Sequence, residues 1–250
     1  MKAPVVYKVG GPALEDPALL APLAAEVKRA SRPVALVHGG GRQVNRLLEA
    51  LAIESRFVEG RRVTSTEAMD VVEMALSGLA NKALAAGLTT AGVVAAGISC
   101  RDAGLVTARL EPDLGRVGLP DTVRPAIIEA LWAANILPVV SPVASGPDGA
   151  SVNVNADEAA LGLARALGAS SLVYLSDVDG VRIDGNTVTS LTAREAEARI
   201  ADGTIAGGMV LKVRVALEAA RSIAQVVIAG RARLEGRFAG TTITAEEVGS

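Results

Sequence analysis

The chain has one cysteine, one histidine and very few aromatic residues, and each scarcity excludes a class of function. The single thiol, Cys100, can form neither an internal disulfide nor a cysteine-rich zinc site, so we expect a small buried residue there. The single histidine, His38, is too little for a Ser-His-Asp or Cys-His catalytic set, and we expect it to make a structural hydrogen bond. Aromatic residues make up 2% of the chain, too few for the base-stacking platforms that bind single-stranded nucleic acids.

Charge of one sign and long apolar runs are also lacking. The formal net charge is −2, so no basic surface dominates, and binding to nucleic acid or to an anionic membrane is not expected. Uninterrupted apolar stretches such as residues 136–144 fall short of the roughly 20 residues that span a membrane. A strand pattern begins at Val5 without a charged leader and cleavage site, so we expect no signal peptide and a cytoplasmic location.

The chain does show a regular alternation of strand and helix patterns. Short apolar runs alternate with segments whose apolar residues recur at helical spacing. Thr64 to Glu67 fits a capping box, Asn155 is a good helix N-cap, and residues 145–149 are typical of a tight hairpin turn. We expect strands over residues 5–9, 33–37, 91–99, 136–143, 171–176 and 225–228, and helices over 123–134, 156–167, 192–200 and 209–222. This alternation predicts an α/β fold with a mainly parallel sheet covered on both faces.

Three glycine clusters lie where strand patterns end or a helix pattern begins, and ligands of parallel sheets bind at such places. They are Gly10-Gly11, Gly39-Gly40-Gly41 and Gly207-Gly208. One such cluster is more typical of a tight turn, but three together favour an anion cradle built from backbone N–H groups. The P-loop, Rossmann and protein-kinase signatures are absent, so those nucleotide sites are excluded.

Four charged residues are further candidates, and each has a functional and a structural interpretation. Lys8 ends a strand pattern, where a buried ammonium needs a partner unless it lies on an edge strand and reaches solvent. Lys212 falls one turn into a helix, where a surface position is the simpler interpretation. Asp157 stands in a first helical turn, where a carboxylate is favoured electrostatically in any case. Arg62 either clamps a carboxylate bidentately or is solvated.

Seven motifs in order and at similar spacings resemble the amino-acid kinase family, over residues from about 4 to 243. The motifs are Lys8-Val9-Gly10-Gly11, His38-Gly39-Gly40-Gly41, Gly60-Arg61-Arg62-Val63-Thr64, Asn81-Lys82, Asn153-Val154-Asn155-Ala156-Asp157, Leu175-Ser176-Asp177-Val178, and Gly208-Met209 with Lys212. Each piece alone is weak, and the succession carries the resemblance. Within the family the motifs are most similar to those of members that phosphorylate N-acetyl-L-glutamate.

The resemblance implies a three-layer αβα sandwich with an open, mainly parallel central sheet, built by residues 1–250 as one domain. Residues 1–170 would form an acceptor-binding and dimerisation lobe, and residues 171–250 a nucleotide-binding lobe. The implied reaction is ATP-dependent phosphorylation of the side-chain carboxylate of N-acetyl-L-glutamate to N-acetyl-L-glutamyl 5-phosphate, a step of arginine biosynthesis. Mg²⁺ would be held mainly by the nucleotide phosphates, with no dedicated metal ligands in the chain.

The resemblance also implies a role for each matching residue. Lys8 and Lys212 would stabilise the phosphoryl group in transfer, and Asp157 would orient both lysines. Because a carboxylate acceptor is already ionised at neutral pH, no general base is needed, which agrees with the lack of histidine. Substrate binding is implied for Gly40, Gly41, Arg62 and Asn153, and nucleotide binding for Gly10, Gly11, Ser176, Asp177, Val178, Gly208 and Met209; the four glycines Gly10, Gly11, Gly40 and Gly41 would donate backbone N–H groups.

Two departures from the family pattern and two alternative functions remain open at this point. Arg61 stands where many relatives carry an apolar residue, and Arg42 where proline is common. The lack of a helical extension before the first strand favours a homodimer without arginine inhibition. One alternative is a kinase for carrier-linked aminoadipate in lysine synthesis; the other is a non-catalytic ligand-binding sensor on the same fold. Carbamate and uridylate kinases match the acceptor motifs less well.

Overall fold

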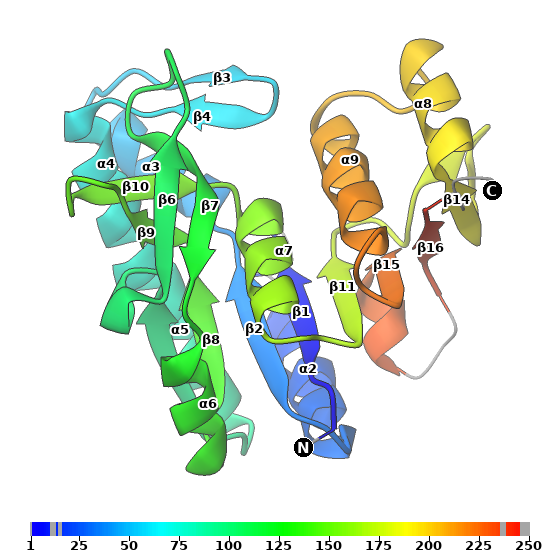
Figure 1. Ribbon diagram of the computed structural model, residues 1–250, viewed down its shortest axis with the longest axis horizontal. Helices are drawn as coiled ribbons and strands as arrows, with labels where there is room; N and C mark the ends of the chain where they lie inside the picture. Colours follow the sequence, from blue (N-terminus) through cyan, green and yellow to red (C-terminus); the bar gives the residue numbers. More distant parts are fainter. Residues whose placement is uncertain (1, 11–13, 15–16, 236–238, 246–250) are drawn as a thin grey trace.

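A computed structural model describes residues 2–10, 14, 17–235 and 239–245, which are organised around a central sheet of eight strands (Figure 1). The strand order is β14-β16-β15-β11-β1-β2-β8-β5. Neighbouring strands are parallel except β15 and β16, which are antiparallel. The strands are β1 (Val5–Val9), β2 (Val34–His38), β5 (Ala95–Ser99), β8 (Leu137–Ser141), β11 (Ser171–Leu175), β14 (Ser190–Thr192), β15 (Gln225–Ala229) and β16 (Thr241–Thr244).

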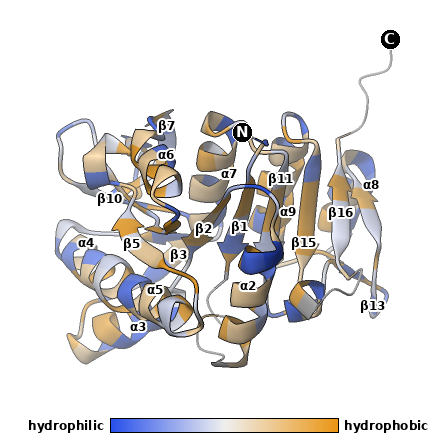
Figure 2. Cartoon of the chain, turned by 90° about the horizontal axis from the view of Figure 1, so that it is seen from below, coloured by the Kyte–Doolittle hydropathy of each residue, from blue (hydrophilic) through white to orange (hydrophobic). Residues whose placement is uncertain are grey.

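Helices cover both faces of this sheet. Successive strand residues point to opposite faces, so Val6 of β1 joins an apolar core with α6, α7 and α9, whereas Tyr7 joins a second core with α2 and α5. Figure 2 shows α6 and α7 on one side of β1 and β2, and α2 and α5 on the other. The helices are α2 (Pro17–Arg29), α3 (Gly41–Ala50), α4 (Thr66–Glu73), α5 (Asn81–Thr90), α6 (Ala126–Ala133), α7 (Ala156–Ala166), α8 (Ala193–Ala201) and α9 (Gly208–Ala220). These layers confirm the predicted αβα sandwich with a mainly parallel sheet.

The predicted capping box at the start of α4 is wrong by one residue. The N-cap is Ser65, whose side chain accepts a hydrogen bond from the backbone N–H of Ala68. The hydroxyl of Thr64 instead donates to the carbonyl oxygen of Arg62 at 2.7 Å. The predicted cap at Asn155 is confirmed, because its side chain accepts from the backbone N–H of Asp157 at 2.8 Å.

Two predicted boundaries differ from the structure, and four short strands form a second sheet outside the central one. Residues 117–123 form β7, so the helix expected from residue 123 begins at Ala126. The strand expected from residue 91 begins at Ala95, because α5 ends in a turn in which Gly92 has φ 83. A closed four-stranded sheet in the order β10-β7-β6-β9 combines β6 (Val106–Leu110), β7 (Val117–Val123), β9 (Val143–Ser145) and β10 (Ser151–Val154). The predicted turn at residues 145–149 joins β9 to β10 and is confirmed.

Two hairpins complete the fold, β3 (Arg56–Val58) with β4 (Arg61–Val63) and β12 (Arg182–Ile183) with β13 (Asn186–Thr187). A π-helical segment, η1 (Met74–Ala80), joins α4 to α5 into one continuous helix, residues 66–90. By length and composition alone this helix could cross a membrane, and half of its most apolar window is buried inside the protein. The sequence analysis weighed only apolar runs as possible membrane spans and did not consider this helix as one. Cys100 is fully buried in the core, as predicted.

Candidate active site

One buried carboxylate holds two lysines that are far apart in the sequence. Lys8 lies near the end of β1, Asp157 in the first turn of α7, and Lys212 in α9. The Nζ of Lys8 lies 2.9 Å from Asp157 Oδ1, and the Nζ of Lys212 lies 3.1 Å from Asp157 Oδ2. The three residues are 7%, 6% and 9% exposed. The structure therefore brings together the three residues predicted to be catalytic, and it excludes the surface interpretation of Lys212.

The charges in this cluster depend on one another. Burial acts to raise the pKa of Asp157, but the two ammonium groups outweigh burial and lower it to about 2. Burial lowers the pKa of Lys8 to about 8, with Asp157 opposing that change and Lys212 adding to it. At neutral pH the cluster thus holds two positive charges and one negative charge. A buried site with a net positive charge attracts an anion such as a phosphoryl group.

Two glycine turns border the lysine cluster. The backbone N–H of Gly10 donates to the carbonyl oxygen of Leu175 at 2.9 Å, so it continues the β1–β11 ladder and is not free for a phosphate. That part of the prediction for Gly10 is wrong, although the residue lies close to Ser176. Gly40 is the N-cap of α3, and a Cβ there would come within 2.6 Å of the Leu76 side chain. Gly11 lies outside the described residues.

His38 supports the glycine turn rather than performing acid–base chemistry. Burial lowers its pKa to about 4, so the imidazole is neutral at physiological pH. Its Nδ1–H donates to the carbonyl oxygen of Gly39 at 2.6 Å, and its Nε2 accepts from the Asn81 amide at 3.0 Å. The same amide nitrogen also donates to the carbonyl oxygens of Ile98 and Val139. The predicted structural hydrogen bond of His38 is confirmed, and Asn81, which the sequence analysis placed in a motif without assigning it a role, supports it.

A cavity of about 410 Å³ opens beside Lys8, and the four residues predicted to bind substrate (Gly40, Gly41, Arg62 and Asn153) all line it. Arg62 donates to the side-chain oxygens of Ser55 and Asn45, and its guanidinium lies 4.6 Å from the centre of the Phe57 ring. The sequence analysis did not predict Ser55, Asn45 or Phe57 as neighbours of Arg62, because these residues belong to no motif with a recognisable spacing.

Asn153 closes the cavity on the side of β10. Its amide donates to the hydroxyl of Thr64 at 3.0 Å, and that hydroxyl in turn donates to the carbonyl oxygen of Arg62. The two residues predicted to bind the α-carboxylate are therefore joined through one threonine. This link ties the Asn153 amide to the backbone of Arg62, and both residues line the same cavity.

Apart from Gly10 and Gly11, the residues predicted to bind nucleotide lie directly after β11 or at the start of α9. Ser176 follows β11 directly, and its hydroxyl donates to the Asp177 carboxylate at 3.0 Å. Gly207, with φ 58, precedes α9, which begins at Gly208 and Met209. A Cβ on Gly208 would meet no atom within 4 Å, so the approach to this helix start is open. Val178 follows Asp177 in the same segment. Open backbone next to Lys212 suits an anionic ligand, and nucleotide binding by these residues remains a prediction.

The amino acid kinase family model matches residues 3–230 of the chain. The chain belongs to the amino acid kinase family. It is 45% identical to the acetylglutamate kinase of Rubrobacter xylanophilus over 239 residues, which are 94% of this chain and 93% of that protein. It is 42% identical to the acetylglutamate kinase of Chloroflexus aggregans over 98% of both chains. In structure it is similar to smu.665 from Streptococcus mutans, with a TM-score of 0.86, 27% identity, and coverage of 98% of this chain and 99% of that one.

These comparisons confirm the resemblance drawn from the seven motifs, together with the fold class. The matched segment contains every residue predicted to be catalytic or to bind substrate or nucleotide. Membership of the amino acid kinase family also gives the chemical class of the activity, phosphoryl transfer to a small molecule. The buried lysine pair, the carboxylate between them and the adjacent cavity are the features of this chain on which that activity depends.

Proposed function

We propose that this protein is an acetylglutamate kinase. It transfers the terminal phosphoryl group of ATP to the side-chain carboxylate of N-acetyl-L-glutamate and forms N-acetyl-L-glutamyl 5-phosphate for arginine biosynthesis. The observation that carries the proposal is the buried cluster of Lys8, Asp157 and Lys212 beside a cavity that contains Arg62 and Asn153. Its relatives from Rubrobacter xylanophilus and Chloroflexus aggregans are acetylglutamate kinases.

The chemistry asked of the cluster is electrostatic. Donor and acceptor are both anions, and the acceptor carboxylate needs no proton removed. Lys8 and Lys212 stabilise the charge that spreads over the oxygens of the transferring phosphoryl group, and Asp157 holds the two ammonium groups 2.9 Å and 3.1 Å from its own oxygens. The neutral imidazole of His38 keeps the glycine turn in place and exchanges no proton with the substrates.

A magnesium ion fits this site only as part of the nucleotide. The side chains around the cavity are cationic or neutral, and the one catalytic carboxylate is occupied by two lysines. Within the described residues, no group of three or more His, Cys, Asp or Glu side chains is arranged to hold a metal. Mg²⁺ bound to the phosphates would neutralise part of the nucleotide charge, and it needs no ligand from the chain to do so.

Arg62 is suited to the α-carboxylate of the acceptor. Its partners in the described part of the chain are the neutral oxygens of Ser55, Asn45 and the Gly41 backbone, so its positive charge is not compensated by a carboxylate there. The amide of Asn153 lies in the same cavity and supplies further donors. The acceptor then extends from Arg62 toward Lys8, with the start of α3 at Gly40 and Gly41 directing N–H groups at the reacting carboxylate.

Residues 1–170 serve as the acceptor lobe and residues 171–250 as the nucleotide lobe of a cytoplasmic homodimer. Met74, Leu79 and Val94 are each more than half exposed, and they lie on η1 and beside β5, the outermost strand of the central sheet. Exposed apolar side chains next to an open sheet edge are typical of an interface. Light scattering on the Leu79→Glu variant is expected to give half the wild-type mass; a monomeric wild type would contradict the dimer.

The proposed activity is tested by trapping the acyl phosphate with hydroxylamine. Purified protein is supplied with Mg-ATP, hydroxylamine and one acceptor at a time, and ADP and hydroxamate are measured. Hydroxamate is expected with N-acetyl-L-glutamate, and not with Lys212→Ala protein. Hydroxamate formed only with carrier-linked aminoadipate would assign the protein to lysine synthesis. No product with any acceptor would favour a non-catalytic sensor on this fold.

A further inference from the structure

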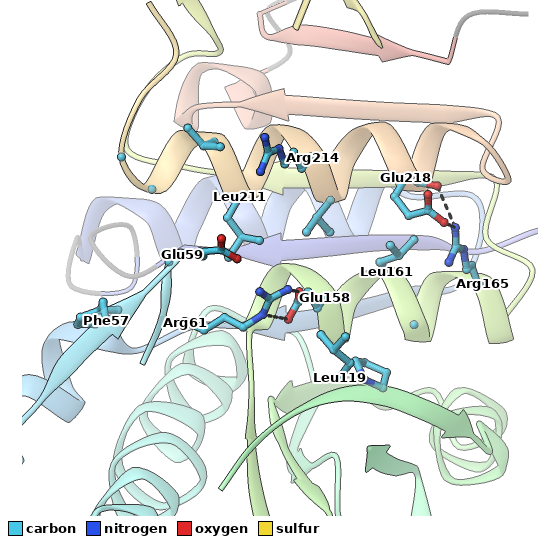
Figure 3. Close-up of a pocket in the computed structure, with 17 residues that line it drawn as sticks. Phe57, Glu59, Arg61, Leu119, Glu158, Leu161, Arg165, Leu211, Arg214 and Glu218 are labelled. Atoms are coloured by element: carbon cyan, nitrogen blue, oxygen red, sulfur yellow. Dashed lines mark hydrogen bonds and ion pairs between the residues drawn. The ribbon is translucent and has the colours of Figure 1, made fainter. Parts of the chain in front are cut away.

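Two adjacent arginines on β4 have different electrostatic surroundings. Arg62 faces the acceptor cavity and has neutral oxygen partners. Arg61 also lines that cavity, but its side chain forms an ion pair with Glu158 of α7. Its Nε lies 3.4 Å from Glu158 Oε2, and its Nη2 makes a shorter contact with Oε1. Figure 3 shows the two side chains pointing toward each other from the hairpin and from the helix.

The Arg61–Glu158 ion pair lines a second cavity, which also holds the Arg165–Glu218 ion pair. The first of these pairs is more protected from water than the second. The side chains of Arg61 and Glu158 are 17% and 9% exposed, and they come from residues 97 positions apart. Arg165 of α7 and Glu218 of α9 also form an ion pair on the wall of this cavity of about 930 Å³, but both side chains are at least 40% exposed. A partly buried pair couples its two elements more strongly than an exposed one, which is worth little.

The hairpin that carries both arginines has few other contacts to hold its tip. All three residues of β3 are exposed, and an isolated two-stranded hairpin is only marginally stable. Its turn residues Glu59 and Gly60 have φ 48 and 80, the backbone of a tight type I′ turn. The tip lies against α9, since a Cβ on Gly60 would come within 3.1 Å of the Leu211 side chain. Contacts at the tip thus add to the hydrogen bonds of Arg62 with Gly41 and Asn45 in fixing the position of the hairpin.

We propose that Arg61 and Glu158 form a positioning contact that holds the β3–β4 hairpin, and with it Arg62, against the catalytic helix α7. Glu158 follows Asp157 in the chain, and Leu211 precedes Lys212, so the tip contacts the neighbours of two catalytic residues. The contact therefore sets the distance between the residue that binds the acceptor and the residues that transfer the phosphoryl group. This inference rests on the proposed function for the role of Arg62.

Two measurements on the same variants test the contact. Hydrogen exchange of the hairpin, residues 55–63, reports its anchoring without substrate, and steady-state kinetics report KM for N-acetyl-L-glutamate, KM for ATP and kcat. In Arg61→Ala we expect faster hairpin exchange and a KM for the acceptor about tenfold higher, the scale of coupling between contacting residues. KM for ATP stays close to the wild-type value. Glu158→Gln preserves the shape of the side chain, and we expect the same changes at smaller size.

Controls separate positioning from a general loss of stability. Arg165→Ala removes the exposed pair from the same helix and is expected to leave hairpin exchange and KM as in the wild type. The exchanged pair Arg61→Glu with Glu158→Arg should recover part of the acceptor KM, which would show that the pairing, and not either side chain alone, sets that KM. Unchanged exchange and unchanged KM in both Arg61→Ala and Glu158→Gln would overturn the proposal. If wild-type protein phosphorylates no acceptor, the proposed function fails, and hairpin exchange still decides whether the contact anchors the hairpin.

Discussion

Replacing Asp157 by asparagine removes the charge that holds the catalytic lysines while keeping the shape of the side chain. The wild-type carboxylate lies 2.9 Å from Lys8 Nζ and 3.1 Å from Lys212 Nζ. Opposite unit charges about 3 Å apart attract by about 5 kcal/mol at an effective dielectric constant of about 20. In Asp157→Asn both attractions are lost, and two buried ammonium groups face each other across a neutral amide.

The buried site relieves that repulsion by releasing a proton from Lys8. Its pKa is already lowered by burial to about 8, and Asp157 is the group that opposes a further fall. Without the carboxylate the pKa of Lys8 falls further, and the transferring phosphoryl group loses positive charge that Lys8 supplies. Losing one preorganised partner of a transition state costs roughly 3–4 kcal/mol, so we expect kcat to fall by two to three decades.

The assay is turnover with N-acetyl-L-glutamate at pH 7.5, measured as ADP and hydroxamate, alongside circular dichroism to verify folding. Asp148→Asn is the matched control, because Asp148, whose side chain is 53% exposed in the β9–β10 turn, pairs with Arg116 and with neither catalytic lysine. It should turn over at the wild-type rate. A folded Asp157→Asn protein with kcat within about tenfold of wild type would refute the electrostatic reasoning.

Two further predictions follow from the same site. Because Lys8 of the ligand-free protein is charged only below its pKa of about 8, wild-type kcat/KM is expected to be highest below that pH and to fall above it; a flat kcat/KM profile up to pH 10 would show that this charge is not required. Arg62→Ala is expected to raise KM for N-acetyl-L-glutamate roughly ten- to hundredfold, since a charge-assisted hydrogen bond is worth about 1.5–3 kcal/mol, and to leave KM for ATP nearly unchanged. An equal rise in both KM values would contradict the assignment of Arg62 to the acceptor.

The regular part of the fold was predictable from local patterns. The apolar run Val34–Val37 lies in strand β2, which is buried along its whole length, as is typical of an inner strand of a parallel sheet. Asn155 as a helix cap and residues 145–149 as a turn follow from side chains that bond to their own backbone. The hairpin of β3 and β4 was missed because each strand has only three residues and neither alternates apolar with polar residues over a recognisable length, although Glu59-Gly60 resembles a turn sequence.

The sequence was enough to predict which residues belong to the site, but not which of them contact one another. Lys212 alone is typical of a helix surface, and only the packing of α9 on the sheet buries it against Asp157. The pairing of Arg61 with Glu158 joins segments 97 residues apart, and no local spacing encodes it. The N–H of Gly10 was assigned to a phosphate because a sequence does not reveal where a strand ladder ends. Hydrogen bonds between distant segments depend on the assembled fold.

The most direct test of the account is a crystal structure of the protein with N-acetyl-L-glutamate and a non-hydrolysable Mg-ATP analogue. The account predicts the α-carboxylate of the acceptor on Arg62 and Asn153, and its side-chain carboxylate beside Gly40 and Gly41. The terminal phosphate of the nucleotide should lie in line with that carboxylate, between Lys8 and Lys212. An acceptor bound in the opposite orientation, or a terminal phosphate remote from both lysines, would contradict it.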